Sequence, residues 1–295
     1  RHGWQYFRRV SLLPEGHLLV IFEGHGMMRL DAASNVVWAS ELAAHHDMVV
    51  VGESIFVLSR RGSVIDRLNT ERPILEDFIT ELALPTGAIK REVSLIEAFE
   101  RSEVPRDHWL SRKQGDLFHT NSLDRLDGRL VGVNPEFAEG RFLISLRSLH
   151  TLAVVDLEDT RVVWARRGQW KRQHDAEVLD NGHVLVFDNL GLSDDRSRVL
   201  ELDPATWDSA WSYGNPLHEA FFTRFCGAQQ RLVGSNTLIT ESAAGRAFEV
   251  TSDGTVVWEW FSPHRAGPNL EYVATLPELQ RIAANTDLSW ATAPE

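Results

Sequence analysis

Hydrophobic and polar residues alternate along most of the chain, in short runs separated by turns that contain glycine. The stretch "QHDAEVLDNGHVLVFDN" (173–189) shows the pattern most clearly: an alternating strand, an Asn-Gly turn, then a second strand of Val, Leu and Phe. "LLPEGHLLVIFE" and "RLVGSNTLITES" have the same strand–turn–strand form. One segment, "LIEAFERSEV" (95–104), has a helical pattern instead. The patterning therefore predicts an all-β protein with a small helical insertion, placed at about 95–117.

A second repeat follows the first and consists of an acidic turn, then Val and Trp. It occurs in "LDAASNVVW", "VDLEDTRVVW", "LDPATWDSAW" and "VTSDGTVVW", which end at Trp38, Trp164, Trp211 and Trp258. The last three of these Trp residues are each 47 residues apart. Units of about 40–50 residues with four antiparallel strands are typical of β-propeller blades. We expect the repeated Trp side chains to pack between neighbouring blades.

The repeats predict five blades and leave residues for a sixth. The five lie at about 5–40, 45–94, 118–166, 173–213 and 224–261. Arg1–Gln5 and Leu270–Asn285 are expected to help build an incomplete sixth blade closed by the termini. The predicted fold is thus a six-bladed β-propeller that forms one domain over residues 1–295.

Composition and charge narrow the classes of partner. The 295 residues carry a net charge of −12, which argues against binding to nucleic acid because such binding needs clustered Lys and Arg. No apolar run reaches the length of a membrane helix. Cys226 is the sole cysteine, so an internal disulfide is excluded, and this fits a reducing compartment without requiring one. The chain begins at Arg1 rather than Met, so a signal peptide or anchor upstream of the given sequence stays open, and the sequence indicates no particular oligomeric state.

Aligning the blades on their turn glycines brings histidines to one position. His174 lies eight residues before Gly182, and the corresponding residues in the other blades are Arg8, His45 or His46, His119, and Cys226 with Arg224. Strand interiors favour β-branched and aromatic residues, so recurring imidazoles have no evident packing role. We expect these side chains to converge at one end of the central channel. Asp47 and Asp175, which follow histidines, could orient the imidazoles or fix turns.

Arginines recur at the start of the third strand of two blades. "SRVLELD" and "GRAFEVT" place Arg198 and Arg246 in corresponding positions. A guanidinium group can bind two oxygens of one sulfate or phosphate at the same time. A histidine ring can donate a hydrogen bond, accept one, or act as a nucleophile. The pattern therefore predicts an anion site that takes a small anionic or aromatic substrate. Two structural alternatives stay open: Arg198 as an ion pair between blades, and Cys226 as a small buried hydrophobic residue.

The chain resembles the bacterial arylsulfotransferases (aryl-sulfate sulfotransferases) from about residue 5 to 265. The resemblance is carried by "FHTNS", "QHDAEVLDNGHVLVFDN", "SRVLELDP" and "QQRLVGSNTLITESAAGRAFEVTSDGTVVWEW". It implies a six-bladed propeller in a periplasmic or secreted protein. It also implies transfer of a sulfuryl group from an aryl sulfate to a phenol through a sulfated histidine, with no nucleotide donor and no required cofactor. By this resemblance His119 and His174 bind the sulfuryl group and transfer protons, and Arg198 binds sulfate.

The nucleophilic histidine of that family has no clear match in this chain. The fifth-blade strand offers Phe225-Cys226-Gly227 at that place, where a thiolate next to Arg224 could attack instead. The predicted catalytic residues are therefore His119, His174 and Cys226. The predicted substrate-binding residues are Arg198, His46, Arg224 and Arg246.

Two other functions remain open on the sequence alone. Imidazoles from separate blades could hold zinc or copper, with His46, His119 and His174 as the ligands. A propeller of this kind could also bind an anionic ligand without any chemistry.

Overall fold

The computed structural model of the chain describes residues 6–110, 114–193, 195–216 and 218–291. They divide into two compact units. The first unit holds the described residues up to Leu123, residues 156–162 and the residues from Ile282 onward, and the second holds 124–155 and 163–281. Within the described ranges, every helix is too short or too polar to cross a membrane.

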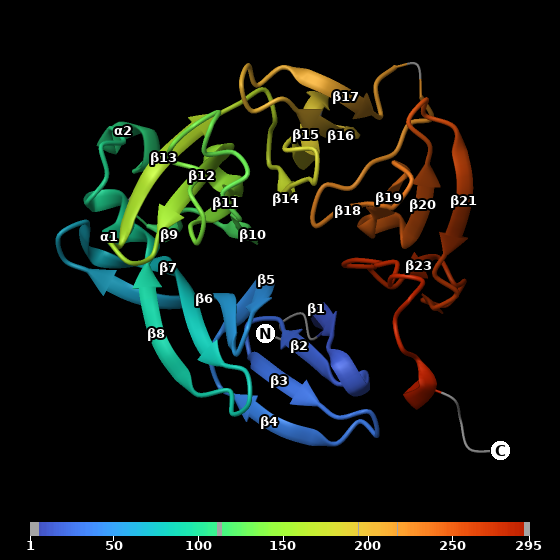
Figure 1. Cartoon of the computed structure of the whole chain (residues 1–295), viewed down its shortest axis with the longest axis horizontal. Helices are drawn as coiled ribbons and strands as arrows, with labels where there is room; N and C mark the ends of the chain where they lie inside the picture. Colours follow the sequence, from blue (N-terminus) through green and yellow to red (C-terminus); the bar gives the residue numbers. More distant parts are fainter. Residues whose placement is uncertain (1–5, 111–113, 194, 217, 292–295) are drawn as a thin grey trace. The chain divides into compact units, whose positions relative to one another are not determined.

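The first two sheets are antiparallel, and their strands follow the order of the chain (Figure 1). One contains β1 (Phe7–Leu12), β2 (Leu18–Phe22), β3 (Gly26–Leu30) and β4 (Val36–Ser40). The next contains β5 (Ala44–Val51), β6 (Ser54–Ile65), β7 (Asn69–Ala83) and β8 (Ile89–Ser94). A two-residue strand, β9 (Gly115–Asp116), adds to this second sheet by pairing in parallel with β7.

Three further four-stranded sheets repeat the same order of strands. The third sheet contains β10 (Thr120–Arg125), β11 (Phe142–Leu146), β12 (Thr151–Asp156) and β13 (Arg161–Arg167). The fourth contains β14 (His174–Val178), β15 (Val184–Ser193), β16 (Arg196–Leu202) and β17 (Ser209–Tyr213). The fifth contains β18 (Ala228–Arg231), β19 (Thr237–Glu241), β20 (Arg246–Val250) and β21 (Val256–Phe261). Short 3₁₀ turns lie at Pro14–Gly16, Arg147–Leu149, Ser242–Ala244 and Ser289–Ala291.

These five sheets coincide with the five predicted blades, and the all-β propeller class is confirmed. The prediction of six blades is wrong, because the described residues form five. After β21 the chain makes only a two-stranded sheet of β22 (Arg265–Ala266) and β23 (Tyr272–Val273). Pro268 and Pro277 lack the N–H that a strand ladder needs. Arg1–Gln5 lies outside the described residues, and the single domain over 1–295 stays a prediction.

The tail after β23 attaches partly to side chains rather than to a strand ladder. The N–H of Leu279 donates to Oγ1 of Thr240 at 3.1 Å, and the N–H of Arg281 donates to Oε1 of Gln230 at 2.8 Å. Contacts of this kind hold a segment in place without building a blade.

The predicted helical insertion contains two short helices, α1 (Leu95–Glu100) and α2 (Arg106–Trp109). The hydroxyl of Ser94 accepts from the N–H of Glu97 at 3.1 Å and caps α1. Behind the helices, the rings of Phe99, Trp109 and Phe118 form a buried cluster, in which Phe99 lies 5.1 Å from Phe118 between ring centroids. This cluster fixes the residue that precedes His119.

Neighbouring blades are joined by the repeated Trp, as the sequence led us to expect. Trp38 on β4 donates its Nε1–H to the carbonyl oxygen of Leu84 in the next blade, at 3.0 Å. Trp211 on β17 donates in the same way to Ser252, at 2.8 Å. The indole therefore supplies both apolar packing and one directed bond.

Aspartates on the first strands make a second kind of connection between blades. Oδ2 of each accepts the backbone N–H of the first strand in the following blade. The pairs are Asp47 with Leu123 at 2.8 Å, Asp124 with Val178 at 2.8 Å and Asp175 with Gln229 at 2.9 Å. Asp47 and Asp175 thus fix backbone, which is one of the two roles that the sequence left open for them.

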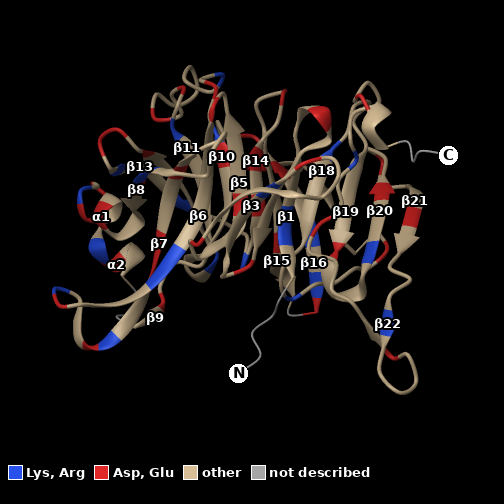
Figure 2. Ribbon diagram, turned by 90° about the horizontal axis from the view of Figure 1, so that it is seen from below, with Lys and Arg blue, Asp and Glu red and all other residues tan. Residues whose placement is uncertain are grey.

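Each unit has its own hydrophobic core. The core of the first includes Leu19, Ile21, Ile55, Val57 and Leu82. Two clusters form the core of the second, and their members include Leu143, Val186, Leu200, Phe187 and Phe248. Acidic residues outnumber basic ones by 42 to 30, and both kinds occur on strands as well as in loops (Figure 2).

Candidate functional site

Two of the predicted site residues, His46 and His119, lie next to each other in the first unit. Their ring centroids are 5.0 Å apart and their planes are inclined by 72°. His46 is 8% exposed, and the side chain of His119 is 22% exposed. The φ angles are +55° at His46 and +50° at His119, a region that residues with a side chain rarely adopt. Unusual backbone of this kind collects at functional sites.

The local backbone explains how both rings reach this place. The pairing of β5 with β6 slips between Ala44 and Met48, so His46 sits in a bulge, which redirects side chains. His119 directly precedes β10. There, Asp77 on β7 accepts both the N–H and the hydroxyl of Thr120 through Oδ2, each at 2.8 Å. The turn at His119 is therefore held by a buried carboxylate.

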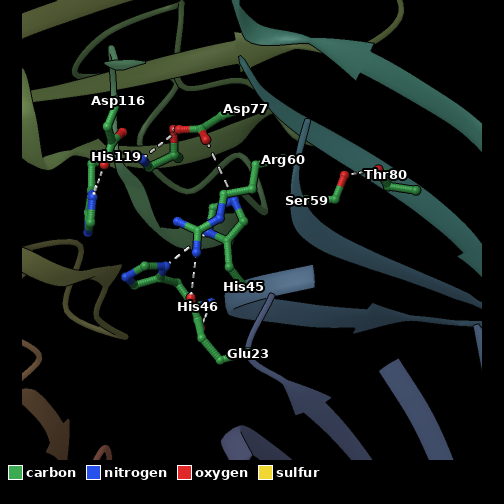
Figure 3. Close-up of polar contacts among 10 residues, drawn as sticks. Glu23, His45, His46, Ser59, Arg60, Asp77, Thr80, Asp116 and His119 are labelled. Carbon is green, nitrogen blue, oxygen red and sulfur yellow. Dashed lines mark hydrogen bonds and ion pairs between the residues drawn. The ribbon is translucent and has the colours of Figure 1, made fainter. Parts of the chain in front are cut away.

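His119 is paired with a carboxylate that the sequence did not single out. Nδ1 of His119 is hydrogen-bonded to Oδ2 of Asp116, which the pairing of β9 with β7 fixes in position (Figure 3). Burial raises the pKa of Asp116, but the hydrogen bond and the charge of His119 outweigh burial and hold that pKa below its usual range. The ionised carboxylate can only accept, so Nδ1 of His119 carries the hydrogen and Nε2 carries the lone pair in the neutral ring.

A buried pair lies on the other side of His46. Nδ1 of His45 is 2.9 Å from Nδ1 of His46, and Nε2 of His45 is 3.7 Å from Oδ1 of Asp77 (Figure 3). Burial lowers the pKa of His45 well below its usual value, helped by the charges of Arg60 and His119, so this ring stays neutral. Burial also raises the pKa of Asp77 to about 6.

Glu23 and Arg60 anchor the bulge from the first two blades. Oε1 of Glu23 accepts from the guanidinium of Arg60 at 3.1 Å, and Oε2 accepts the backbone N–H of His46 at 3.3 Å. The carboxylate of Glu23 thereby ties the guanidinium of Arg60 to the backbone of the bulge.

His174 belongs to the second unit and is held in one tautomer there. Its Nδ1 bonds to Oδ1 of Asn189 at 2.7 Å and to the carbonyl oxygen of Arg172 at 3.1 Å. Nδ2 of Asn189 donates to the carbonyl oxygens of Thr223 and Cys226, both at 2.8 Å, which fixes the orientation of the amide. Both partners of Nδ1 are acceptors, so this nitrogen carries the hydrogen.

Arg198, the predicted sulfate-binding residue, is engaged within its own unit. Its Nε donates to Oδ2 of Asp188 at 2.8 Å, and one terminal nitrogen donates to the carbonyl oxygen of Gln169 at 3.0 Å. Asp188 also accepts the N–H of Lys171 at 2.8 Å. The group therefore fastens the loop that leads to His174, and sulfate binding by Arg198 stays a prediction.

The remaining predicted residues lie in different settings. The guanidinium of Arg246 contacts three carboxylates, those of Glu219, Glu241 and Glu259. Such a setting favours an ion-pair network over anion binding. Arg224 is exposed, and Cys226 is half-buried with a φ of +58°. This geometry neither supports nor contradicts the predicted roles of Arg224 and Cys226.

Comparison with known proteins decides the family. The family model described as arylsulfotransferase (ASST) matches residues 9–265, which is most of the chain. The chain belongs to the arylsulfotransferase family. The resemblance inferred from the sequence motifs is thereby confirmed. No curated protein matches this arylsulfotransferase-family chain.

Solved structures similar to this arylsulfotransferase-family chain are distant in sequence. A protein of unknown function from Bacteroides caccae gives a TM-score of 0.57 at 13% identity, over 88% of this chain and 82% of the other. The Dos1 propeller gives a TM-score of 0.50 at 12% identity, over 89% of this chain and 59% of the other. At such identities the likeness shows the propeller fold alone.

Sequence reasoning missed the partners of the histidines in this arylsulfotransferase-family chain. Asp116 stands three residues before His119, a spacing that could have drawn notice. Asp77 and Asn189 lie on strands with ordinary patterning and gave no signal. The predicted zinc or copper site would need His174 of the second unit in addition to His46 and His119 of the first, and it stays a prediction.

Proposed function

We propose that this arylsulfotransferase-family chain transfers a sulfuryl group from an aryl sulfate to a phenol, and that His119 carries the group between them. One observation supports this above the others: the hydrogen bond between Nδ1 of His119 and Oδ2 of Asp116. It leaves the lone pair on Nε2, and the carboxylate stabilises the positive charge that the ring gains when Nε2 forms a bond. The family resemblance implied that His119 binds the sulfuryl group and transfers protons, whereas this geometry favours a covalent role.

The transfer takes place in two balanced steps. Nε2 of His119 attacks sulfur while the bond from sulfur to the aryl oxygen breaks, and the electron pair of that bond leaves with the aryl oxide. The oxygen of the acceptor phenol then attacks the same sulfur and gives its proton to a base. The bond between sulfur and nitrogen breaks, and its electron pair returns to Nε2.

Exposure favours His119 over its buried neighbour His45, and a charged partner favours it over Cys226. Its side chain is 22% exposed, whereas that of His45 is 1% exposed. Among the described residues, the thiol of Cys226 has no hydrogen bond or ion pair that would stabilise a thiolate. His119 thus combines an available lone pair with a charged partner.

Turnover of a chromogenic aryl sulfate by variants tests the proposal. His119→Gln should abolish turnover with a phenol acceptor. Asp116→Asn keeps an acceptor for Nδ1 but removes the charge, so we expect a fall of about 10²–10⁴-fold in kcat. Asp107→Asn, an exposed acid of the same insertion, is the matched control and should behave as the native chain does. If His119→Gln turns over the aryl sulfate at the native rate, His119 takes no part in the reaction and the proposal is wrong.

A further inference from the structure

We infer that the loop between β13 and β14, together with His150, forms a binding site in the second unit for an oxyanion group such as sulfate. The group is held by the Nε2–H of His150 and by the guanidinium groups of Arg167 and Arg172. The site uses none of the residues that the sequence predicted for substrate binding. It goes beyond the proposed sulfuryl transfer and does not depend on it.

The loop carries a concentration of positive charge that is unusual for this chain. Residues 166–172 read "RRGQWKR", so four of these seven residues are Lys or Arg. The whole chain has 30 such residues against 42 acidic ones. Like charges that are held close together repel one another and attract anions. The loop is therefore a region where an otherwise acidic chain favours an anion.

Contacts within the second unit hold the loop in one conformation. The carbonyl oxygen of Gln169 accepts from the guanidinium of Arg198 at 3.0 Å. The side chain of Trp170 is buried, and the N–H of Lys171 donates to Oδ1 of Asp188 at 2.8 Å. The loop thus presents its cations from a fixed backbone, which lowers the cost of ordering them around a ligand.

His150 lies against the end of this loop and offers a hydrogen-bond donor. Its Nδ1 accepts the backbone N–H of Arg172 at 3.0 Å. Because the accepting nitrogen carries the lone pair, the hydrogen of the neutral ring is on Nε2. Among the described residues, Nε2 of His150 has no hydrogen-bond partner. The side chain is half-buried, and its Nε2–H can donate to a ligand.

The ring of His150 is surrounded by positive charge. Burial lowers the pKa of His150 below its usual value, and neighbouring cations lower it further, so the ring is neutral at pH 7.5. In decreasing order of effect, these cations are Arg167, Arg172, Lys171 and Arg147. An anion next to the ring is attracted by the same charges.

Two of these cations are not neutralised by a carboxylate. In the part of the chain that the structure describes, neither Arg167 nor Arg172 makes an ion pair. Arg167 is exposed and Arg172 is half-buried. Arg198 differs from them, since it is paired with Asp188. A guanidinium that faces no carboxylate can bind two oxygens of one oxyanion, and this is the role we assign to Arg167 and Arg172.

NMR titration of the full chain, labelled with ¹⁵N in histidine, tests the site with sodium sulfate at pH 7.5. Chloride keeps the ionic strength constant, and the signals of His150 are assigned by their absence in His150→Gln. We expect the Nε2 signal of His150 to move with added sulfate and to saturate as for a single site. Arg167→Gln should raise the Kd for sulfate at least about tenfold, because it removes a hydrogen bond between charged groups.

Arg166→Gln is the matched control because it removes the same charge from the same loop. The guanidinium of Arg166 lies over the ring of Trp207, 5.5 Å from its centroid, and is not one of the charges that act on His150. Its loss should change the Kd by less than about twofold, since water and salt screen the more distant charge.

A parallel titration with benzenesulfonate identifies the source of the oxyanion. Tighter binding than that of sulfate assigns the site to an oxyanion group on an aromatic molecule, and weaker binding assigns it to the free anion. The sulfur of benzenesulfonate is bonded to carbon and not to an ester oxygen. It therefore cannot act as a donor in the proposed reaction, and the titration reports on binding alone.

A His150 signal that moves with neither anion contradicts the inference, and so does a Kd that is the same in Arg167→Gln and the native chain. Equal losses in Arg166→Gln and Arg167→Gln also contradict it, because general attraction by the loop then explains the binding. If sulfate binds at His150 as expected but the native chain turns over no aryl sulfate, the oxyanion site stands and the proposed sulfuryl transfer fails.

Discussion

The group bonded to Nδ1 distinguishes the candidate histidines from one another. His119 faces a carboxylate, His46 faces a second imidazole, and His174 faces an amide oxygen and a backbone carbonyl. A carboxylate stabilises a positively charged ring, whereas neutral oxygens fix the tautomer without adding a charge. His119 is therefore the ring best suited to carry a bonded sulfuryl group, and His174 is suited to exchange a proton.

His174→Gln tests the role that the sequence motifs gave to His174. The side chain of glutamine can still donate to Asn189, so we expect the melting temperature to fall by only a few degrees. Loss of acid–base assistance should lower aryl sulfate turnover by at least about a hundredfold. Calorimetry and turnover assays measure the two effects.

His183→Gln is the control on the same hairpin, where His183 pairs with Glu201 at 2.7 Å, and it should keep its activity. If His174→Gln has native turnover, or unfolds the protein, His174 is a structural residue.

The sequence located the histidines of the site but not their partners. Counting back from the turn glycines placed His46 and His119 at strand starts, because turns set the register of hairpins. The partner of Thr120, Asp77, is 43 residues away on the third strand of another blade. Hydrophobic patterning shows which face of a strand is buried, but it carries no information on which acid meets which imidazole.

Among the strands, the repeated Trp residues differ in how much surface they bury. Trp38 is 8% exposed and donates to Leu84, whereas Trp258 on β21 is 37% exposed and lies under the guanidinium of Arg281. We expect Trp38→Ala to lower the free energy of unfolding by about 3–5 kcal/mol. Trp258→Ala should cost about 1–2 kcal/mol because less apolar surface is lost. Urea unfolding of both variants measures the difference, and equal losses would contradict this account of blade packing.

The aspartate connection between β10 and β14 predicts a pH dependence of stability. Burial raises the pKa of Asp124 to about 6, although the N–H of Val178 opposes this, and an unfolded Asp titrates near 3.9. The folded state therefore holds more protons between these values, and the contribution of Asp124 to the free energy of unfolding falls as pH rises from about 4 to 6. Asn can accept the same bond without the buried charge.

Asp124→Asn should accordingly be more stable than the native chain at pH 7, by on the order of 2 kcal/mol, with little difference at pH 4. Thermal melts at both pH values measure this gain. Asp180→Asn, at a fully exposed carboxylate, is the control and should show no such gain. If the difference in stability between Asp124→Asn and the native chain is the same at pH 4 and pH 7, the explanation is wrong.

Blade positions followed from the sequence because strand–turn–strand patterns recur along the chain and a Trp recurs on the last strand of four of the five blades. The failure at the sixth blade has a physical cause. Residues 270–285 are short of strand alternation, contain Pro277, and are held partly by side chains such as Thr240 and Gln230. An expectation drawn from the blade count of a family cannot replace strands that the local sequence does not form.

For the molecule as a whole, family membership and chemistry rest on different observations. The match over residues 9–265 and the propeller similarity define the family and the fold. Similar folds carry many activities, so the reaction must be argued from the site. Here that argument depends on Asp116, on β9 at the end of the insertion, and on His119, directly before β10.

Mass spectrometry of the intact chain after brief mixing with an aryl sulfate, without acceptor, tests the central claim most directly. The account predicts a covalent gain of one SO₃ group, located on His119 by peptide mapping under alkaline conditions. The adduct should disappear when a phenol is added and should be absent from His119→Gln. An adduct on Cys226 or His174, or release of phenol from the aryl sulfate with no adduct at any residue, would contradict the account.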